Sequence, residues 1–497
     1  MKKSLLLLNL VCSLCFFNAC TSASSTTPPH VANHFSVSTP AAANVGTSFS
    51  SLTVIALDAS NNVVTNYSGT VHFTSTDSHA VLPANSTLTG GSEAFSATFN
   101  TSGNQTITAT DTAKSTITGV SNETQVCCTA PAGTFTPTGS MKFQRIGHTA
   151  TLLQNGTVLI AGGDEPGLTS FVPLASAEIY NPATGTFTST GSMGTARVGH
   201  TATLLANGKV LIAGGNDATG TLATTEVFDP STGSFSPANG NMEIARVGHT
   251  ATLLNDGTGR VLVAGGGTSP AVFFGPVPDQ GSASAELFDP NSGQFTPAGN
   301  NMSSRRIYHT ATLLPNGDVL LAGGTNNGSA LGDLFAPASA MFTATATGGT
   351  TNLHLAAAAL QDGSALLTGG GSIGGGCPVP TWEVDKRAFL FDDSDASFSQ
   401  TGEMSVSRES HTATLLPGGD VLIAGGVDGP VRCSSDFGEV ATAELFSRAS
   451  GSFTLTGSME TARAGHTATL LGNGQVLVVG GTSGGLGNVL TSAELFQ

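Results

Sequence analysis

The sequence contains few charged residues and few large aromatic residues. Charged side chains make up 10% of the 497 residues, and there are one tryptophan and three tyrosines. About 25% charge is usual in soluble proteins, so long solvated helices are not expected. No lysine or arginine cluster is available to neutralise phosphates, which argues against nucleic acid as a partner. After residue 20, no apolar run reaches the roughly 20 residues of a membrane-spanning helix.

Glycine and small apolar residues take the place of the missing charge. There are 64 glycines, the hydrophobic fraction is 39%, and 33 acidic residues outnumber 17 basic ones to give a net charge of −16. This hydrophobic fraction is too high for a disordered chain. The composition indicates an exported all-β protein.

The first twenty residues have the layout of a secretion signal. Lys2 and Lys3 precede an apolar stretch from Leu5 to Phe17, which is followed by Asn18-Ala19-Cys20, and such a segment is removed on export. The end of this segment, FNAC, resembles a bacterial lipobox, which implies lipidation of Cys20. Residues 21–30 then form a Ser/Thr/Pro tether. We expect an outer-membrane or cell-surface lipoprotein with a lipid anchor; simple secretion, or a periplasmic location, is the alternative.

Residues 31–126 alternate apolar residues with Ser and Thr, as half-buried strands do. The segments FSLTVIALD, GTVHFTST and QTITATD are examples, separated by turn-forming pairs such as Asn61-Asn62. The pattern predicts a small β-sandwich. It resembles the immunoglobulin-like repeats of bacterial surface proteins, which implies a spacer or an adhesion unit.

The rest of the chain repeats one unit with a mean period of 53 residues, calculated as (466 − 148)/6 from the first and last histidines of the repeated motif. The motif HTATLL is followed by an apolar segment that ends in two glycines, then by a segment like AELFD, and finally by a phenylalanine before TGSM. Four short strands per period are typical of propeller blades. The glycine pairs are residues 162–163, 214–215, 265–266, 323–324, 369–370, 425–426 and 480–481.

These motifs resemble kelch repeats, and the resemblance covers residues 132–497. It implies a seven-bladed β-propeller. The family's usual tryptophan in the fourth strand is replaced here by a phenylalanine, at positions 135, 187, 235, 295, 342, 398 and 453. The first of these precedes any first strand, and the chain stops after a third strand. We therefore expect residues 133–141 to supply the outer strand of the last blade, which would close the ring.

Six repeats carry an arginine three residues before the histidine and an acidic residue in the third strand. In the fifth repeat the three positions hold Asn352, Leu355 and Phe389, so all three polar groups are lost together. Joint loss is what a mutually satisfied buried network predicts. The expected network comprises Arg145, His148, Glu178, Arg197, His200, Glu226, Arg246, His249, Glu286, Arg306, His309, Asp333, Arg408, His411, Glu444, Arg463, His466 and Glu494. Because one histidine per blade is spread around a ring, these residues do not predict a metal site.

An enzymatic alternative comes from the segment RRIYHTATLLPNGDVLLAGG, which resembles galactose oxidase, a kelch-type propeller. The resemblance implies that Tyr308 and His309 match a Tyr-His pair that binds copper. The second tyrosine of that site is missing, because Tyr67 lies outside the propeller and Tyr180 stands where other repeats have phenylalanine. We therefore expect no cofactor and no catalytic residue, with a glycan-modifying enzyme as the alternative.

The variable loops that follow the glycine pairs are the expected place for a ligand. Those of the fifth and sixth repeats contain the only tryptophan, so a ligand surface is predicted from Trp382, Asp385, Arg387, Asp428, Arg432 and Asp436. The alternative is that Trp382 has a structural role and only caps its blade. The function predicted is that of a non-enzymatic, monomeric binding or adhesion protein for a glycan or an extracellular protein. Cys377 and Cys433 occupy matching loop positions and are expected to form a disulfide, whereas Cys127 and Cys128 are left unassigned.

Overall fold

The computed structural model describes residues 31–497 apart from 41, 45–47, 100, 102, 128–132, 167–170, 272–276, 278–280, 326–331, 347–348, 375–380, 430–437 and 486. The chain divides into two compact units, Met1–Ala130 and Pro131–Gln497. The described residues form strands and no helix, so the fold is all-β. Accordingly, no described helix has the length and apolarity needed to cross a bilayer.

The first unit contains three small sheets, with strand orders β1-β3-β6, β2-β10-β7 and β5-β4-β8-β9. Its strands are β1 (His34–Ser38), β2 (Ala42–Asn44), β3 (Ser48–Leu57), β4 (Thr70–Ser75), β5 (Ser86–Thr87), β6 (Ser92–Thr98), β7 (Gly103–Gln105), β8 (Ile107–Asp111), β9 (Thr118–Val120) and β10 (Thr124–Cys127). The apolar residues alternate along β3 and β8, so the inward side chains of both strands enter one core with Phe35 and Phe73. The alternation seen in the sequence therefore corresponds to strands whose inward side chains share one core.

The second unit contains seven four-stranded antiparallel sheets. In chain order the first three are β12 (Thr149–Leu152), β13 (Val158–Ala161), β16 (Ala177–Asn181), β17 (Thr186–Ser189); β18 (Thr201–Leu204), β19 (Val210–Ala213), β20 (Thr225–Asp229), β21 (Ser234–Pro237); and β22 (Thr250–Leu253), β23 (Val261–Ala264), β24 (Ala285–Asp289), β25 (Gln294–Pro297). The next three are β26 (Thr310–Leu313), β27 (Val319–Ala322), β28 (Asp333–Ala336), β29 (Met341–Ala344); β30 (Ala356–Ala359), β31 (Ala365–Thr368), β34 (Ala388–Asp392), β35 (Ser397–Gln400); and β36 (Thr412–Leu415), β37 (Val421–Ala424), β40 (Ala443–Ser447), β41 (Ser452–Leu455).

The seventh sheet takes strands from both ends of the unit. It runs β42 (Thr467–Leu470), β43 (Val476–Val479), β44 (Ala493–Phe496) and β11 (Phe135–Pro137). β11 pairs antiparallel with β44, placing Phe135 opposite Phe496. Their rings are 4.9 Å apart, and the amide of Gln497 donates to the carbonyl of Thr134. Residues near position 135 are thus joined to the last residues of the chain through a continuous sheet.

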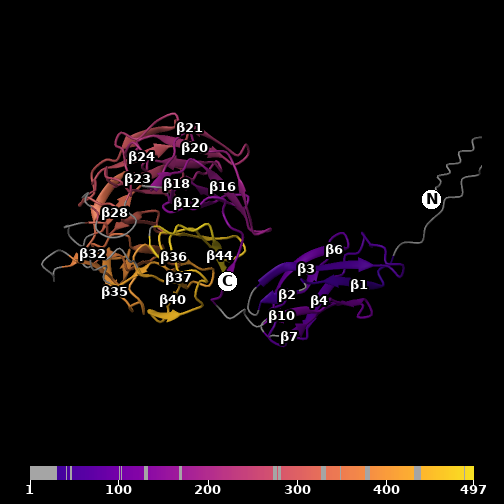
Figure 1. Cartoon of the computed structure of the whole chain (residues 1–497). Coiled ribbons are helices and arrows are strands. Elements are labelled where there is room, and N and C mark those ends of the chain that lie inside the picture. Colours follow the sequence, from indigo (N-terminus) through magenta and orange to yellow (C-terminus); the bar gives the residue numbers. More distant parts are fainter. Residues whose placement is uncertain are drawn as a thin grey trace, which may run out of the picture. The chain divides into compact units, whose positions relative to one another are not determined.

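The seven sheets are arranged around a common centre (Figure 1). Each sheet's first strand contacts the first strand of the next, in the order β12, β18, β22, β26, β30, β36 and β42, and β42 contacts β12. Three two-stranded sheets extend the connections that follow the glycine pairs: β14 (Asp164–Pro166) with β15 (Phe171–Pro173), β32 (Gly371–Gly374) with β33 (Thr381–Val384), and β38 (Val427–Asp428) with β39 (Gly438–Glu439). Because the first strands meet in a cycle, residues just before them from all seven sheets gather at one end of the ring's centre.

The glycine pairs are required because two sheets meet closely at the end of each second strand. Gly162 has φ 61° and Gly163 has φ 93°. A Cβ on Gly162 would lie 2.6 Å from the carbonyl oxygen of Arg197 and equally close to the ring of His200, both in the next sheet. Glycine alone fits a left-handed backbone in such a space. The repeated pair therefore marks where neighbouring sheets touch.

The repeated phenylalanines pack within their own sheets. Each lies against an aromatic ring of the third strand, with centroids 4.8 to 5.0 Å apart. In the first sheet that partner is Tyr180, which is fully buried.

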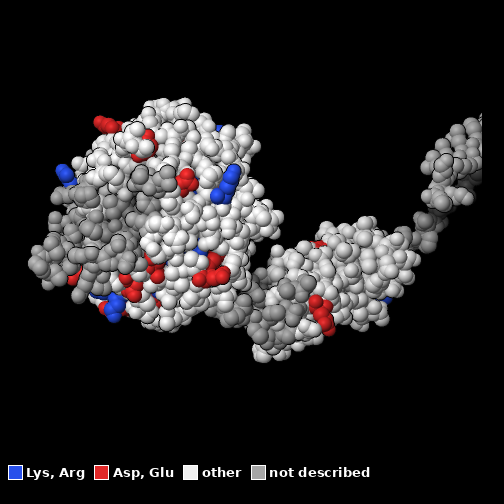
Figure 2. All heavy atoms as spheres, in the orientation of Figure 1, with Lys and Arg blue, Asp and Glu red and all other residues white. Residues whose placement is uncertain are grey.

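The face seen in Figure 2 is mostly uncharged, with scattered acidic and basic side chains and no dense basic cluster over the described residues.

Candidate functional site

Six buried arginines are paired with six carboxylates of the third strands. The Arg Nη2 to carboxylate oxygen distances lie between 2.7 and 3.1 Å. Arg197 illustrates the geometry: its guanidinium also donates to the carbonyls of Gly214 and Thr224, while Glu226 accepts the backbone amides of Gly194 and Thr195. Burial lowers the pKa of Arg197, and the Glu226 carboxylate opposes that shift. Each arginine therefore bonds both to the end of the second strand and to the third strand. The charges of the pair are used in these structural contacts.

We expect Arg197→Met to destabilise the protein by about 3 to 5 kcal/mol, because it leaves the buried Glu226 carboxylate without its cation. The double variant Arg197→Met/Glu226→Leu should recover much of that loss, as apolar replacements of buried ion pairs often do. Chemical unfolding measures both. The exposed pair Lys209–Asp229, in the same sheet, is the control, and Lys209→Met should leave the unfolding midpoint unchanged. Equal effects of Arg197→Met and Lys209→Met would contradict the structural role.

The repeated histidines make a different contact from the one expected. Among the described residues, no hydrogen bond joins their side chains to the Arg or carboxylate side chains; instead, each Nε2 bonds to a threonine of the preceding sheet. The distances range from 2.7 to 3.1 Å for the pairs His148–Thr467, His200–Thr149, His249–Thr201, His309–Thr250, His411–Thr368 and His466–Thr412. The predicted three-way network is therefore wrong in this respect, because the ring of first strands places each histidine beside a neighbouring sheet.

The fifth sheet makes the same histidine contact through a threonine at a different position. In the other cases the threonine directly follows the histidine position, as Thr149 does opposite Ala161. In the fifth sheet Ala356 stands at that place and faces Thr368 on the second strand. His411 bonds to Thr368 at 2.7 Å instead. In this sheet the hydroxyl that bonds to the histidine of the next sheet is therefore on the second strand, whereas in the other sheets it is on the first strand.

One residue before each histidine position, the seven sheets form a collar around the centre of the ring. The collar consists of Gly147, Gly199, Gly248, Tyr308, His354, Ser410 and Gly465, all with φ between 50° and 64°. Backbone hydrogen bonds link neighbouring members: Ser410 donates to His354, His354 to Tyr308, and Tyr308 to Gly248. The left-handed conformation suits glycine but costs other residues about 1 to 2 kcal/mol each. Three adjacent sheets nevertheless carry side chains there.

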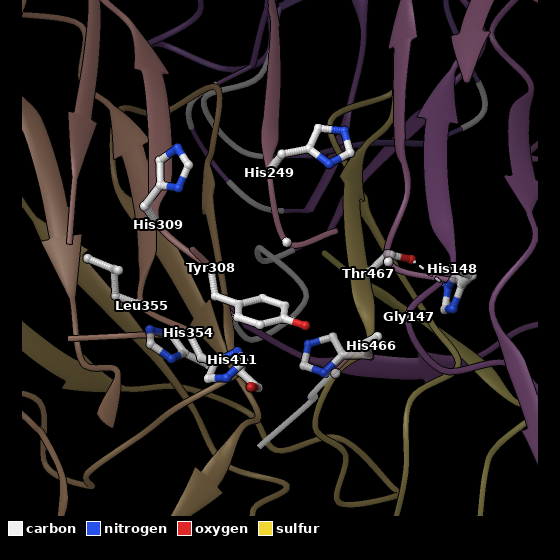
Figure 3. A pocket seen from close by; sticks show the side chains of 15 residues that line it. Gly147, His148, His249, Tyr308, His309, His354, Leu355, His411, His466 and Thr467 are labelled. Carbon is white, nitrogen blue, oxygen red and sulfur yellow. Dashed lines mark hydrogen bonds between the residues drawn. The ribbon is translucent and has the colours of Figure 1, made fainter. Parts of the chain in front are cut away.

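The collar surrounds a pocket of about 310 Å³ (Figure 3). It is lined by Gly147, His148, Gly199, Gly248, His249, Ala271, Tyr308, His309, His354, Leu355, Ser410, His411, Gly465, His466 and Thr467. Tyr308 extends across the pocket with its hydroxyl away from its own strand, and its ring lies 4.4 Å from that of His354 at an interplanar angle of 31°. The Nε2 atom of His354 is buried without a hydrogen-bond partner. The polar collar side chains thus occupy one side of the pocket and glycines the other.

The pocket carries no formal charge. Its described lining contains no Lys, Arg, Asp or Glu. Burial lowers the pKa of His148, His249, His354 and His411 to about 3, and that of His309 and His466 well below the usual value. All six imidazoles are therefore neutral at physiological pH. The lining offers hydroxyl groups, neutral imidazole and aromatic carbon.

Trp382 is not the surface anchor that the sequence suggests. Its side chain is only 3% exposed and packs against Ile307 and Leu353. Its Nε1 donates to the buried Glu409 carboxylate at 2.6 Å. The indole fits there because Gly371 lies opposite, where a Cβ would be 2.4 Å from the ring. Trp382 thus belongs to the apolar cluster against which Tyr308 packs.

The other residues of the predicted ligand surface do not line the pocket. Arg387 pairs with Asp385 at 2.6 Å, and Asn352 also donates to Asp385, which partly replaces the lost Arg–Glu pair of the fifth sheet. Asp428 accepts a hydrogen bond from Ser407. The remaining predicted residues lie outside the described residues, namely Arg432 and Asp436 of the ligand surface, Cys377 and Cys433 of the disulfide, and the lipidation residue Cys20. The signal that could have found the pocket is the collar position itself, where four repeats have glycine and three consecutive repeats have Tyr308, His354 and Ser410.

Comparisons with known proteins give a likeness of fold. No family model matches the chain and no curated protein matches it. A solved structure titled "Novel fungal alcohol oxidase with catalytic diversity among the AA5 family, in complex with copper" matches with a TM-score of 0.58 and 18% identity, over 74% of this chain and 76% of that one. The chain therefore resembles this structure in fold over that length.

The collar does not provide the donor set of a copper centre. His309, the expected partner of Tyr308, has its Nε2 3.0 Å from the hydroxyl of Thr250, and Tyr308 stacks on His354 instead. The described part of the chain contains no group of three His, Cys, Asp or Glu side chains placed to hold a metal ion. Since copper needs several N, O or S donors at one point, the residues described do not fit this ion.

Proposed function

We propose that the second unit is a seven-bladed kelch-type β-propeller, that the first is an immunoglobulin-like β-sandwich, and that the collar pocket binds the end of a glycan. Seven four-stranded sheets in cyclic contact support the propeller. Three sheets packed on one core support the sandwich. The protein would be exported, anchored through Cys20 by the tether of residues 21–30, and would act as a monomer on a glycan or a glycosylated extracellular protein.

The observation that carries the proposal is the asymmetry of the collar. Four sheets have glycine at a left-handed position that suits glycine, whereas three adjacent sheets have Tyr308, His354 and Ser410 there. Non-glycine residues with this backbone conformation are uncommon, and three of them beside one pocket suggest a functional role. The strained side chains face a pocket whose volume is near the lower end of the range for small-ligand sites.

A labelled full-length protein applied to a glycan array tests this proposal. Ser410→Tyr should fill the pocket and reduce binding at least tenfold, and tyrosine is tolerated at this backbone position, since Tyr308 occupies it in the fourth sheet. Ser231→Tyr, at an exposed turn of the second sheet, is the matched control and should bind like the wild type. Unchanged binding by Ser410→Tyr, or no glycan bound by the wild type, would reject the collar pocket as the site.

A second candidate is oxidation of a primary alcohol of a glycan, which is favoured by the fold likeness to a copper alcohol oxidase. Copper retained by the purified protein, together with hydrogen peroxide released from O₂ and a galactose-terminated glycan, would support it. Absence of both would leave binding as the function. The incomplete donor set around Tyr308 leads us to place binding first.

A further inference from the structure

The chemistry of the pocket restricts the ligand further than the fold does. The part of the lining that the structure describes contains no Lys, Arg, Asp or Glu. A carboxylate or sulfate transferred into it would lose its hydration without gaining a cation, and an ammonium group would find no carboxylate. The arginines closest in sequence to the collar point into the sheets, as Arg306 does toward Asp333. The ligand that this site favours is therefore uncharged.

The polar side chains of the collar are suited to hydroxyl groups. Tyr308 and Ser410 carry hydroxyls that can both donate and accept, and neutral imidazole does the same through its two nitrogens. Tyr308 also presents an aromatic ring, to which the apolar face of a sugar ring can pack. The glycines on the opposite side contribute no side chain to the lining. The volume of about 310 Å³ is enough for one sugar residue and not for a long chain segment.

Stability gives an independent reason for a ligand role. Glycine occupies the same left-handed position in four sheets, so glycine at positions 354 or 410 is compatible with this architecture and would relieve strain. The Nε2 of His354 is buried without a hydrogen-bond partner, as is the Nδ1 of each of the six repeated histidines, so this feature does not by itself mark a ligand contact.

We propose that Tyr308, His354 and Ser410 form a subsite for one neutral, hydroxyl-bearing terminal sugar and reject the matching uronic acid. The inference rests on the proposed glycan-binding function and adds the charge class and the residues that select it. Recognition of the sugar comes from three adjacent sheets of the ring. The other four sheets have glycine at the collar position.

The test compares methyl glycosides of neutral hexoses with the corresponding methyl hexuronides, which differ only by a carboxylate at C6. Saturation-transfer NMR and calorimetry on the full chain should show at least tenfold weaker binding of the uronides. Tyr308→Phe should weaken binding of the neutral glycoside about five- to tenfold by removing one hydroxyl. His354→Gly/Ser410→Gly should weaken it at least tenfold while the Tm stays equal to that of the wild type or rises by about 1 to 3 °C.

Ala396→Gly is the matched control, because Ala396 also has a left-handed backbone, with φ 53°, at a turn far along the same sheet from the collar. It should raise the Tm to a similar extent and leave binding unchanged. Equal or tighter binding of the uronide would overturn the neutral-ligand inference while leaving glycan binding intact. Wild-type affinity in the double glycine variant would overturn the subsite. Failure of every glycan on the array would instead reject the proposed function itself.

Discussion

Below pH 6 we expect the second unit to lose stability steeply and to unfold with a net uptake of several protons. Seven buried histidines have pKa values lowered by burial, to about 3 or well below the usual range, namely His148, His200, His249, His309, His354, His411 and His466. In the unfolded chain a histidine titrates near 6.5. Between pH 6 and 4 these seven groups therefore bind protons only when the unit unfolds, and acid favours unfolding.

One carboxyl group acts in the opposite direction. Burial raises the pKa of Asp164 to about 7, so this group binds its proton in the folded state first and stabilises the fold as the pH falls. The seven histidines outnumber this one carboxyl group, so unfolding takes up protons on balance and stability falls as the pH falls.

Urea unfolding at pH values from 8 to 4 measures this linkage. His200→Gln should reduce the proton uptake by one, and His72→Gln, in the first unit, should leave it unchanged. A stability that is flat from pH 7 to 4.5 would show that the ring histidines are accessible to protons in the folded protein.

The second large effect concerns the seam of the ring. Deleting residues 133–141 should lower the Tm by more than 10 °C or cause association. It removes the pairing of Phe135 with Phe496 and the buried Met141, a loss of several kcal/mol. It also leaves β44 as an open edge, which can pair with another chain.

Deleting residues 21–126 is the comparison, since it leaves all seven sheets of the second unit complete. Calorimetry and size-exclusion chromatography measure the two truncations. The same Tm and a monomeric profile for both proteins would mean that β11 contributes little to the closure.

Much of the fold can be predicted from local sequence patterns. The two-residue alternation predicts strands, and the 53-residue period predicts seven repeats of four strands, because each repeat carries the same apolar segments and turn glycines. The structure has seven such sheets, with the outer strand of the last sheet taken from residues 135–137. The paired Arg and Glu positions are visible in the same way, since buried partners vary together.

Which residues form the candidate site depends on the tertiary structure. Trp382 is unique in the sequence, yet whether an indole is exposed depends on space, and the missing side chain of Gly371 leaves room to bury it. Tyr308, His354 and Ser410 are 46 and 56 residues apart in the chain, as 354 − 308 and 410 − 354 show. They meet only because the cyclic contact of the first strands brings one residue from each sheet to the same axis. Sequence spacing gives the order of the sheets, whereas closure of the ring determines which side chains share a pocket.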